Sequence, residues 1–326
     1  MVSSSMTTTV DQGGGTTIFA IHPDILQTHI LTRLDGPTLA SAGCTSSQLH
    51  ALSTEEKLWM DICNHKWPST NHPRVHKLIS TFTAGHRSFF SDSFPTLDPH
   101  HRPSQPNPHS SSFTSELIFA VDIHYQDKLI FSRVQEIETL TGWFLCSPFR
   151  VDYLCEKEIV PTPVRFECGE DTCRLNLEEN LTLSCIVINP TRKRAANVSS
   201  LRPILVQRHW LTGEIQLQYT TILAGHQRGR SSEFVQCRMV VTCGRGGEGG
   251  ELQVREVSLL TEDMDEKNLT GKESLLIFQK AVDSGGRKIG KRGEERESYV
   301  CRRKKIKNTG KDFISGYKFL YALGTE

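Results

Sequence analysis

Long apolar runs are missing from this sequence. No stretch approaches the roughly 18 consecutive apolar residues that a membrane-spanning helix requires. The amino end, Met1 to Gly15, is rich in serine, threonine and glycine and has no apolar segment like that of a secretory signal peptide. The formal net charge is only +1, which favours neither an acidic nor a basic partner. We therefore expect a soluble chain that is not exported by this route.

Motifs that organise a catalytic nucleophile or a phosphate are also missing. The sequence contains no G-x-S-x-G elbow, no P-loop and no H-E-x-x-H pair. Residues 244–249 satisfy G-x-G-x-x-G, but residues 251–257 then alternate like a strand. A dinucleotide site needs a helix there, because the amino end of that helix binds the pyrophosphate. We interpret the segment as a glycine-rich hairpin loop and expect no catalytic residues and no cofactor.

Cysteine is present without a disulfide framework or a zinc pattern. The 10 cysteines are spread from Cys44 to Cys301, which predicts reduced and mostly buried thiols. Structural zinc sites need four ligands and closer spacings than those of two cysteine pairs, Cys168 with Cys173 and Cys237 with Cys243. Two further groups of potential metal ligands have simpler explanations. The first is Cys63 with His65, His72 and His76, where Cys63 belongs to the apolar stripe of a helix. The second is His100, His101 and His109, which we interpret as solvated histidines of a linker. We expect no bound metal.

Amphipathic helical patterns fill residues 21–67. The first helix is predicted to begin at Pro23, whose missing N–H suits the first helical position. Asp24 then places negative charge in the first turn, where it interacts favourably with the helix dipole. Asp35-Gly36-Pro37 combines a turn former with a residue suited to a helix start, so it ends the first helix and begins a second.

The second and third helices complete the amino-terminal pattern. Small residues at positions 42–44 allow a neighbour to lie close to the second helix. Ser53 and Glu56 have the spacing of a capping box for the third helix, which ends at Trp67 before Pro68. Three helices of this length bury too little surface to cover every apolar face. The pattern is therefore either a plain three-helix core or a module whose remaining apolar surface is covered by another polypeptide.

The order of the large apolar residues resembles an F-box. The anchors are Ile21-x-x-Asp24-Ile25-Leu26, Ile30-Leu31-x-x-Leu34, Pro37-x-Leu39, Ala40-Ser41-x-x-Cys44 and Leu58-Trp59, and residues 84–90 are similar to a group of plant F-box proteins. His22 stands where the family usually has proline, and Leu49 where a tryptophan is common. The resemblance implies docking to a Skp-type adaptor. Its implied adaptor-binding residues are Ile21, Pro23, Ile25, Leu26, Ile30, Leu31, Leu34, Leu39, Cys44, Leu58 and Trp59.

A β-rich region follows the helices. From Glu116 the apolar residues alternate, which predicts strands, and Thr212-Gly213 marks the clearest hairpin. Residues 273–282 are predicted to form a short closing helix. Six or more strands separated by turns favour a sandwich or a barrel. The predicted fold class is α+β, with a three-helix F-box, a following helix and a mainly antiparallel, sandwich-like β domain.

The predicted boundaries follow these changes in composition. They are a disordered amino terminus (1–17), an F-box (18–70), a bridging helix (71–93), a linker rich in proline, serine and histidine (94–115), a β-rich recognition domain (116–282) and a basic, largely disordered tail (283–326). The tail is either a solvated arm or a nuclear-import signal formed by Arg302, Arg303, Lys304, Lys305 and Lys307. It lacks the interleaved aromatics that base stacking uses, so nucleic-acid binding is not expected.

The predicted function is that of a non-catalytic adaptor. The resemblance implies a substrate-recognition subunit of a Skp–cullin–F-box ubiquitin ligase, with a cullin–RING scaffold and an unidentified protein substrate as partners, in the nucleus or cytoplasm. Four aromatic residues are candidate substrate contacts, although we favour the sheet core for each: Trp143, Phe144, Trp210 and Tyr219. The alternatives are a lectin-like β-sandwich binding protein without a ligase role and an enzyme built on the glycine loop.

Overall fold

The computed structural model describes residues 21–98, 114–165, 170–225, 233–246 and 250–288. The chain divides into two compact units, residues 1–62 and 63–326. The division falls inside helix α4 (Glu56–Lys66). Helices followed by antiparallel strands confirm the predicted α+β class.

The first unit begins with one continuous helical run, made of α1 (Pro23–Ile25), η2 (Leu26–Ile30) and η3 (Leu31–Arg33). As predicted, it starts at Pro23 with Asp24 in the first turn. The break at residues 35–37 is also confirmed, because the Asp35 carboxylate accepts the Thr38 N–H at 3.0 Å and caps α2 (Gly36–Gly43).

An unpredicted helix, α3 (Ser47–Ser53), lies between α2 and α4. Its amino end is capped by Ser46, whose hydroxyl accepts the Leu49 N–H at 3.2 Å. Ser53 is the last residue of α3 and donates to the His50 carbonyl, so the predicted Ser53–Glu56 capping box is wrong. Ser53 and Glu56 have the spacing of a capping box, but Ser53 is part of α3 and therefore cannot be the N-cap of α4. Gly43 allows the close approach of α3, because a Cβ there would meet the Ser53 hydroxyl.

The second unit opens with η4 (Pro68–Asn71), α5 (Pro73–Ile79) and α6 (Gly85–Ser93). The region predicted as a bridging helix (71–93) thus holds two α-helices, and Gly85 at the start of the second has a φ of +49°, which side chains rarely tolerate. Trp67 packs edge-on against Phe89, with ring centroids 5.7 Å apart. These helices therefore have an aromatic core of their own.

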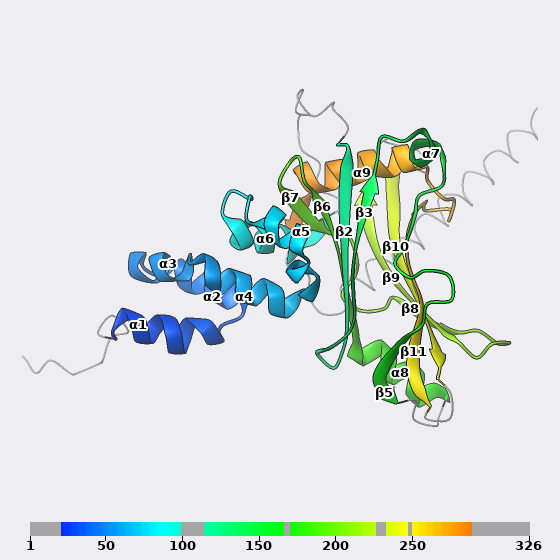
Figure 1. Cartoon of the computed structure of the whole chain (residues 1–326), viewed down its shortest axis with the longest axis horizontal. Helices are drawn as coiled ribbons and strands as arrows, with labels where there is room; N and C mark the ends of the chain where they lie inside the picture. Colours follow the sequence, from blue (N-terminus) through cyan, green and yellow to red (C-terminus); the bar gives the residue numbers. More distant parts are fainter. Residues whose placement is uncertain (1–20, 99–113, 166–169, 226–232, 247–249, 289–326) are drawn as a thin grey trace, which may run out of the picture. The chain divides into compact units, whose positions relative to one another are not determined.

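Two antiparallel sheets form most of the β-rich part of the second unit (Figure 1). The four-stranded sheet has the order β3 (Lys128–Glu138), β2 (Glu116–Tyr125), β6 (Leu181–Asn189) and β7 (Arg194–Asn197). The six-stranded sheet has the order β4 (Arg150–Asp152), β11 (Glu251–Asp263), β10 (Phe234–Arg245), β9 (Ile215–Ala224) and β8 (Leu205–Arg208), and β5 (Val160–Arg165) also pairs with β11.

The two sheets share one hydrophobic core, as a sandwich requires. Alternate residues of β2 and β10, among them Phe119 and Met239, belong to the same buried cluster. Helix α9 (Gly271–Ser284) closes one end of it, and Phe278 lies 5.4 Å from Phe119 between ring centroids. Thr270 and Glu273 make a complete capping box at the start of α9, which explains why this predicted helix forms. Two unpredicted helices complete the unit, α7 (Gly142–Cys146) and α8 (Glu170–Asn180).

The opposite face of the four-stranded sheet is also covered. Ile118, Ala120 and Asp122 alternate with the core residues of β2 and are buried as well. Helices η4 and α6 lie against this sheet, η4 on β2 and β3 and α6 on β7. The second unit is therefore a helical layer on a two-sheet sandwich.

Local predictions of hairpins are confirmed. Gly213 has a φ of +69° in the turn between β8 and β9. Gly244 and Arg245 end β10 and pair with Gln253 and Leu252 of β11, so a strand and not a helix follows the glycine motif, which excludes a dinucleotide fingerprint there.

Two predicted irregular segments are corrected. Residues 96–98, placed in the linker, form strand β1 (Thr96–Asp98), and residues 286–288, placed in the tail, form β12 (Gly286–Lys288). The two strands pair with each other, with Leu97 opposite Arg287. Each is too short to be recognised alone, because it exists only as the partner of a segment about 190 residues away.

Candidate docking and recognition surfaces

Several predicted adaptor-binding residues build the first unit from inside. The buried ones are Leu26, Leu31, Leu39, Leu58 and Trp59. The Trp59 indole N–H donates to the Ser53 carbonyl at 2.7 Å, which fixes α4 to the end of α3. These residues therefore support the helices, and their substitution would damage the fold before it tested binding.

The remaining predicted residues are accessible. Ile25 is 50% exposed, and Pro23 and Cys44 are exposed as well. Ile21, Ile30 and Leu34 are half-buried. Apart from Cys44, all of them lie on or next to the first helical run. Their role in docking stays a prediction, and its accessible part consists of this run and Cys44.

A π-helical turn places two buried leucines of that run on the same side. The Leu31 N–H bonds to the Leu26 carbonyl across five residues, so these two leucines share the buried side. The Thr28 hydroxyl donates to the Asp24 carbonyl at 2.6 Å. Ile25 precedes the π turn and is exposed, because successive residues of a helix point roughly 100° apart and Ile25 lies away from the side that Leu26 and Leu31 share.

A buried carboxylate joins the helical layer of the second unit to the four-stranded sheet. Asp122 on β2 is 1% exposed and accepts three hydrogen bonds: from the Ser69 N–H at 2.9 Å, from the Ser69 hydroxyl at 2.5 Å and from the Ser132 hydroxyl at 2.7 Å. Burial raises the pKa of Asp122 to about 6, although these three hydrogen bonds act in the opposite direction. The sequence signal for this junction is a lone carboxylate within an otherwise apolar stretch of the strand.

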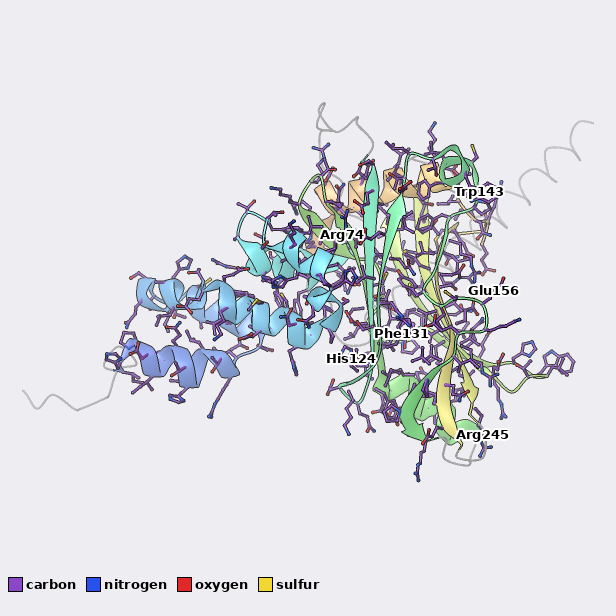
Figure 2. The ribbon with its side chains drawn as sticks, in the orientation of Figure 1. Arg74, His124, Phe131, Trp143, Glu156 and Arg245 are labelled. Atoms are coloured by element: carbon purple, nitrogen blue, oxygen red, sulfur yellow. The ribbon has the colours of Figure 1, made fainter. Side chains whose placement is uncertain are left out.

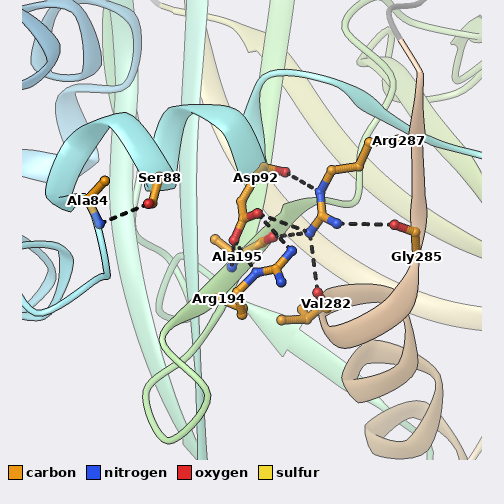
Figure 3. Close-up of polar contacts among 8 residues, drawn as sticks. All are labelled: Ala84, Ser88, Asp92, Arg194, Ala195, Val282, Gly285 and Arg287. Atoms are coloured by element: carbon orange, nitrogen blue, oxygen red, sulfur yellow. Dashed lines mark hydrogen bonds and ion pairs between the residues drawn. The ribbon is translucent and has the colours of Figure 1, made fainter. Parts of the chain in front are cut away.

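A second polar junction holds α6, β7 and β12 together (Figure 3). The Arg194 guanidinium binds the Asp92 carboxylate through Nε at 2.7 Å and Nη2 at 2.9 Å. Arg287 donates to the Asp92 carbonyl at 3.1 Å and to three further carbonyls, those of Ala195, Val282 and Gly285. Burial lowers the pKa of Arg287, and the nearby Asp92 partly offsets this. Arg287, which we had counted in the basic tail, is therefore a structural residue.

A third junction is more exposed. Arg74 on α5 bonds Glu116 on β2 at 2.6 Å and Glu136 on β3 at 2.9 Å, at the edge of the helical layer (Figure 2). Together the three junctions attach the helices of the second unit to the sandwich at several points.

Two of the four candidate contact aromatics are fully on the surface. Trp143 is 84% exposed and Trp210 is 88% exposed. Our preference for the sheet core is wrong for both, whereas Tyr219 is buried as expected. Phe144 is partly buried and lies 6.2 Å from Phe149 between ring centroids. Trp143 marks the end of the sandwich near α9, and Arg245 marks the opposite end (Figure 2).

Thiols and histidines form no metal site within the described ranges. No group of three or more potential ligands occurs there. Cys237 and Cys243 are buried on β10, and burial raises the pKa of Cys185 on β6 to about 12, so this thiol stays protonated. Cys44, Cys146 and Cys155 are exposed. The described residues also contain no helix long and apolar enough to cross a bilayer.

Some predicted sites lie outside the described residues. These are Cys168, the three linker histidines (His100, His101 and His109) and the basic run from Arg302 to Lys307. The interpretation of the basic run as an import signal stays a prediction.

The chain is similar to proteins of Arabidopsis thaliana. It is 47% identical to F-box protein At3g44326 in an alignment of 309 residues, and this alignment covers 92% of this chain and 84% of the relative. It is 42% identical over 302 residues to F-box protein At2g27310 (89% and 86%) and 45% identical over 282 residues to Probable F-box protein At2g36090 (85% and 78%). No family model and no solved structure matches the chain.

Proposed function

Because the chain belongs to the F-box protein family, we propose that it is the substrate receptor of a Skp–cullin–F-box ubiquitin ligase. The first helical run docks to a Skp-type adaptor, which is in turn bound by a cullin–RING scaffold. The β sandwich holds the target protein. The observation that carries this proposal is the similarity over 85–92% of the chain, which extends from the helices through the β-rich part.

The proposed mechanism is proximity. A receptor that holds a target lysine near the ubiquitin-charged enzyme raises its effective concentration and needs no reactive group of its own. The protonated core thiol Cys185 and the hydrogen-bonded Asp122 are buried groups that act in folding. The proposal therefore assigns no catalytic residue to this chain.

The docking surface is testable at a residue that the fold does not need. Ile25→Asp places a charge on a half-exposed position of the first helical run. Desolvating that charge in an interface costs several kcal/mol, so we expect a loss of binding. The matched control is Leu129→Asp, because Leu129 is 43% exposed and lies on β3 of the second unit.

The measurement is co-purification of the full-length protein with a recombinant Skp-type adaptor, followed by titration calorimetry. We expect the original protein and Leu129→Asp to bind and Ile25→Asp to fail, with equal thermal midpoints for all three. Equal binding by Ile25→Asp would reject the docking surface. Failure of the unsubstituted protein to form any complex would reject the ligase role and favour the lectin-like alternative.

We also propose a nuclear pool of the protein. Its basis is the basic run Arg302-Arg303-Lys304-Lys305-Ile306-Lys307, a composition typical of import signals. Substituting alanine for the five cationic residues of the run is expected to shift a fluorescent fusion from nucleus and cytoplasm to cytoplasm alone. An unchanged distribution in cells would contradict an import role.

A further inference from the structure

The tip of the β8–β9 hairpin carries two large apolar side chains that the fold leaves uncovered. Trp210 is 88% exposed and the adjacent Leu211 is 72% exposed. The hairpin projects from the sandwich body (Figure 1). Isolated exposed apolar residues are common on proteins, but an adjacent tryptophan and leucine on a projecting turn form a concentrated apolar surface. We call these two residues the hairpin knob.

The backbone beneath the knob is fixed by hydrogen bonds. The His209 N–H donates to the Glu214 carbonyl at 2.7 Å, and the Gly213 N–H donates to the His209 carbonyl at 2.9 Å. The Thr212 N–H donates to His209 Nδ1 at 3.1 Å, and Arg208 Nε donates to the Gly213 carbonyl at 3.2 Å. A turn held at this many points loses little conformational entropy when its side chains are bound.

The hairpin is also tied to the neighbouring strands. Arg255 on β11 bonds the Glu214 carboxylate at 2.7 Å and the Arg245 carbonyl at 3.2 Å. This pairing joins the root of the hairpin to the β10–β11 hairpin. The knob is therefore held out from the sheet by a braced support, which is the geometry of an anchor residue in an interface.

The polar groups around the knob define the partner that fits it. Because a backbone N–H can only donate, His209 Nδ1 accepts from Thr212 and the ring proton is assigned to Nε2. The His209 ring lies beside the indole of Trp210, with ring centroids 6.4 Å apart and an interplanar angle of 24°. The tip thus presents apolar surface together with two N–H donors, the imidazole Nε2–H and the indole Nε1–H, and Arg208 stands at its base.

We infer that the hairpin knob is an anchor for the protein that this receptor captures, and that it inserts into an apolar pocket rimmed by carboxylate or carbonyl acceptors. This inference rests on the proposed function. A convex knob requires a concave partner, which an extended peptide does not provide. The Glu214 carboxylate at the hairpin root is paired with Arg255, so its charge does not distinguish a protein pocket from an anionic lipid surface, and the vesicle experiment below separates the two.

The knob is one part of a wider contact. Two side chains cover a few hundred Å² at most, whereas a stable interface uses about 800 Å² from each partner. The surrounding end of the sandwich supplies the rest, and the knob supplies most of the binding energy. Truncating such a tryptophan anchor is expected to weaken binding by at least about 30-fold.

The test compares two double variants of the full-length protein. Trp210→Ser with Leu211→Ser removes the knob, and Leu129→Ser with Leu175→Ser removes exposed apolar residues from β3 and α8. Each protein is fused to a proximity-labelling enzyme in plant cells. Labelling of the Skp-type adaptor reports the proposed function. Proteins whose labelling is lost only in the knob variant are the candidate targets. Each candidate is purified and titrated by calorimetry against the original chain, the knob variant and the control variant.

We expect at least one purified protein to bind the original chain and the Leu129–Leu175 variant equally and the knob variant at least about 30-fold more weakly. Equal binding to the knob variant, or the absence of any knob-dependent protein, would overturn the inference. So would knob-dependent binding to vesicles of phosphatidylcholine and phosphatidylserine without a protein partner. If the unsubstituted chain does not label the Skp-type adaptor, the proposed function is rejected. This outcome is separate from the test of the knob, because knob-dependent binding is measured without the adaptor.

Discussion

Replacing Asp122 by asparagine should change how the stability of this protein depends on pH. Asp122 lies in the dry junction between η4 and the four-stranded sheet, where it accepts from Ser69 and Ser132. Asparagine keeps one oxygen for the Ser69 N–H and removes the buried charge. The Ser69 hydroxyl can rotate to accept from the new amide.

The magnitude follows from the raised pKa. Burial raises the pKa of Asp122 from 3.8 to about 6, which is equivalent to roughly 3 kcal/mol. A raised pKa means that the folded protein holds the proton more tightly than the unfolded chain. This contribution to the free energy of unfolding is therefore present below pH 3.8 and is lost as the pH rises through about 6.

The Asp122→Asn variant lacks this loss. Relative to the original protein, its free energy of unfolding should rise by roughly 3 kcal/mol between pH 3.5 and pH 7.5. Urea unfolding at both pH values, followed by tryptophan fluorescence, measures the difference. Asp127→Asn is the matched control, since Asp127 is an exposed carboxylate of the same hairpin with a φ of 61° that asparagine tolerates.

A third variant separates the charge from the hydrogen bonds. Asp122→Ala leaves the buried Ser69 N–H without its acceptor, so it should be less stable than Asp122→Asn by about 1–3 kcal/mol at both pH values. The control should stay within about 0.5 kcal/mol of the original protein throughout. If Asp122→Asn and the original protein gave parallel pH profiles, the buried carboxylate would not titrate as its environment requires and the reasoning would be refuted.

Two further predictions concern packing and polar contacts in the second unit. Gly271→Ala should lower the free energy of unfolding by about 1–3 kcal/mol, because a Cβ at this position would meet the backbone carbonyl of Phe144. The control is Gly142→Ala, where a Cβ would meet open space. Thermal unfolding of both variants measures the difference, and equal midpoints would contradict the prediction. Arg287→Met should cost about 2–4 kcal/mol in urea unfolding, because it removes the donor of four carbonyl groups, and the adjacent, exposed Lys288→Met should cost far less. A similar loss from both substitutions would show that the contacts of Arg287 contribute nothing specific.

Local chemistry in the sequence determined many elements of this protein. Pro23 begins a helix because its fixed φ suits that position, and Asp35 caps the next one with its carboxylate. Alternation predicted β2 from Glu116 to Tyr125, and Gly213 predicted the turn of a hairpin. Each of these features depends on residues only a few positions apart, so a single sequence contains the whole signal. The order of anchors likewise identified the family.

Tertiary structure decided which surfaces face water and which segments meet. Periodicity shows that side chains share a face, but it does not show what covers that face. Trp210 was therefore predicted to lie in the sheet core, whereas it is exposed at the tip of a projecting hairpin, and a π turn places Leu26 and Leu31 on the same buried side. Arg287 looked like part of a charged tail until strand β12 brought it to Asp92. Contacts between residues so distant in sequence form only when the chain folds, because their free energy comes from the partner and not from the local segment.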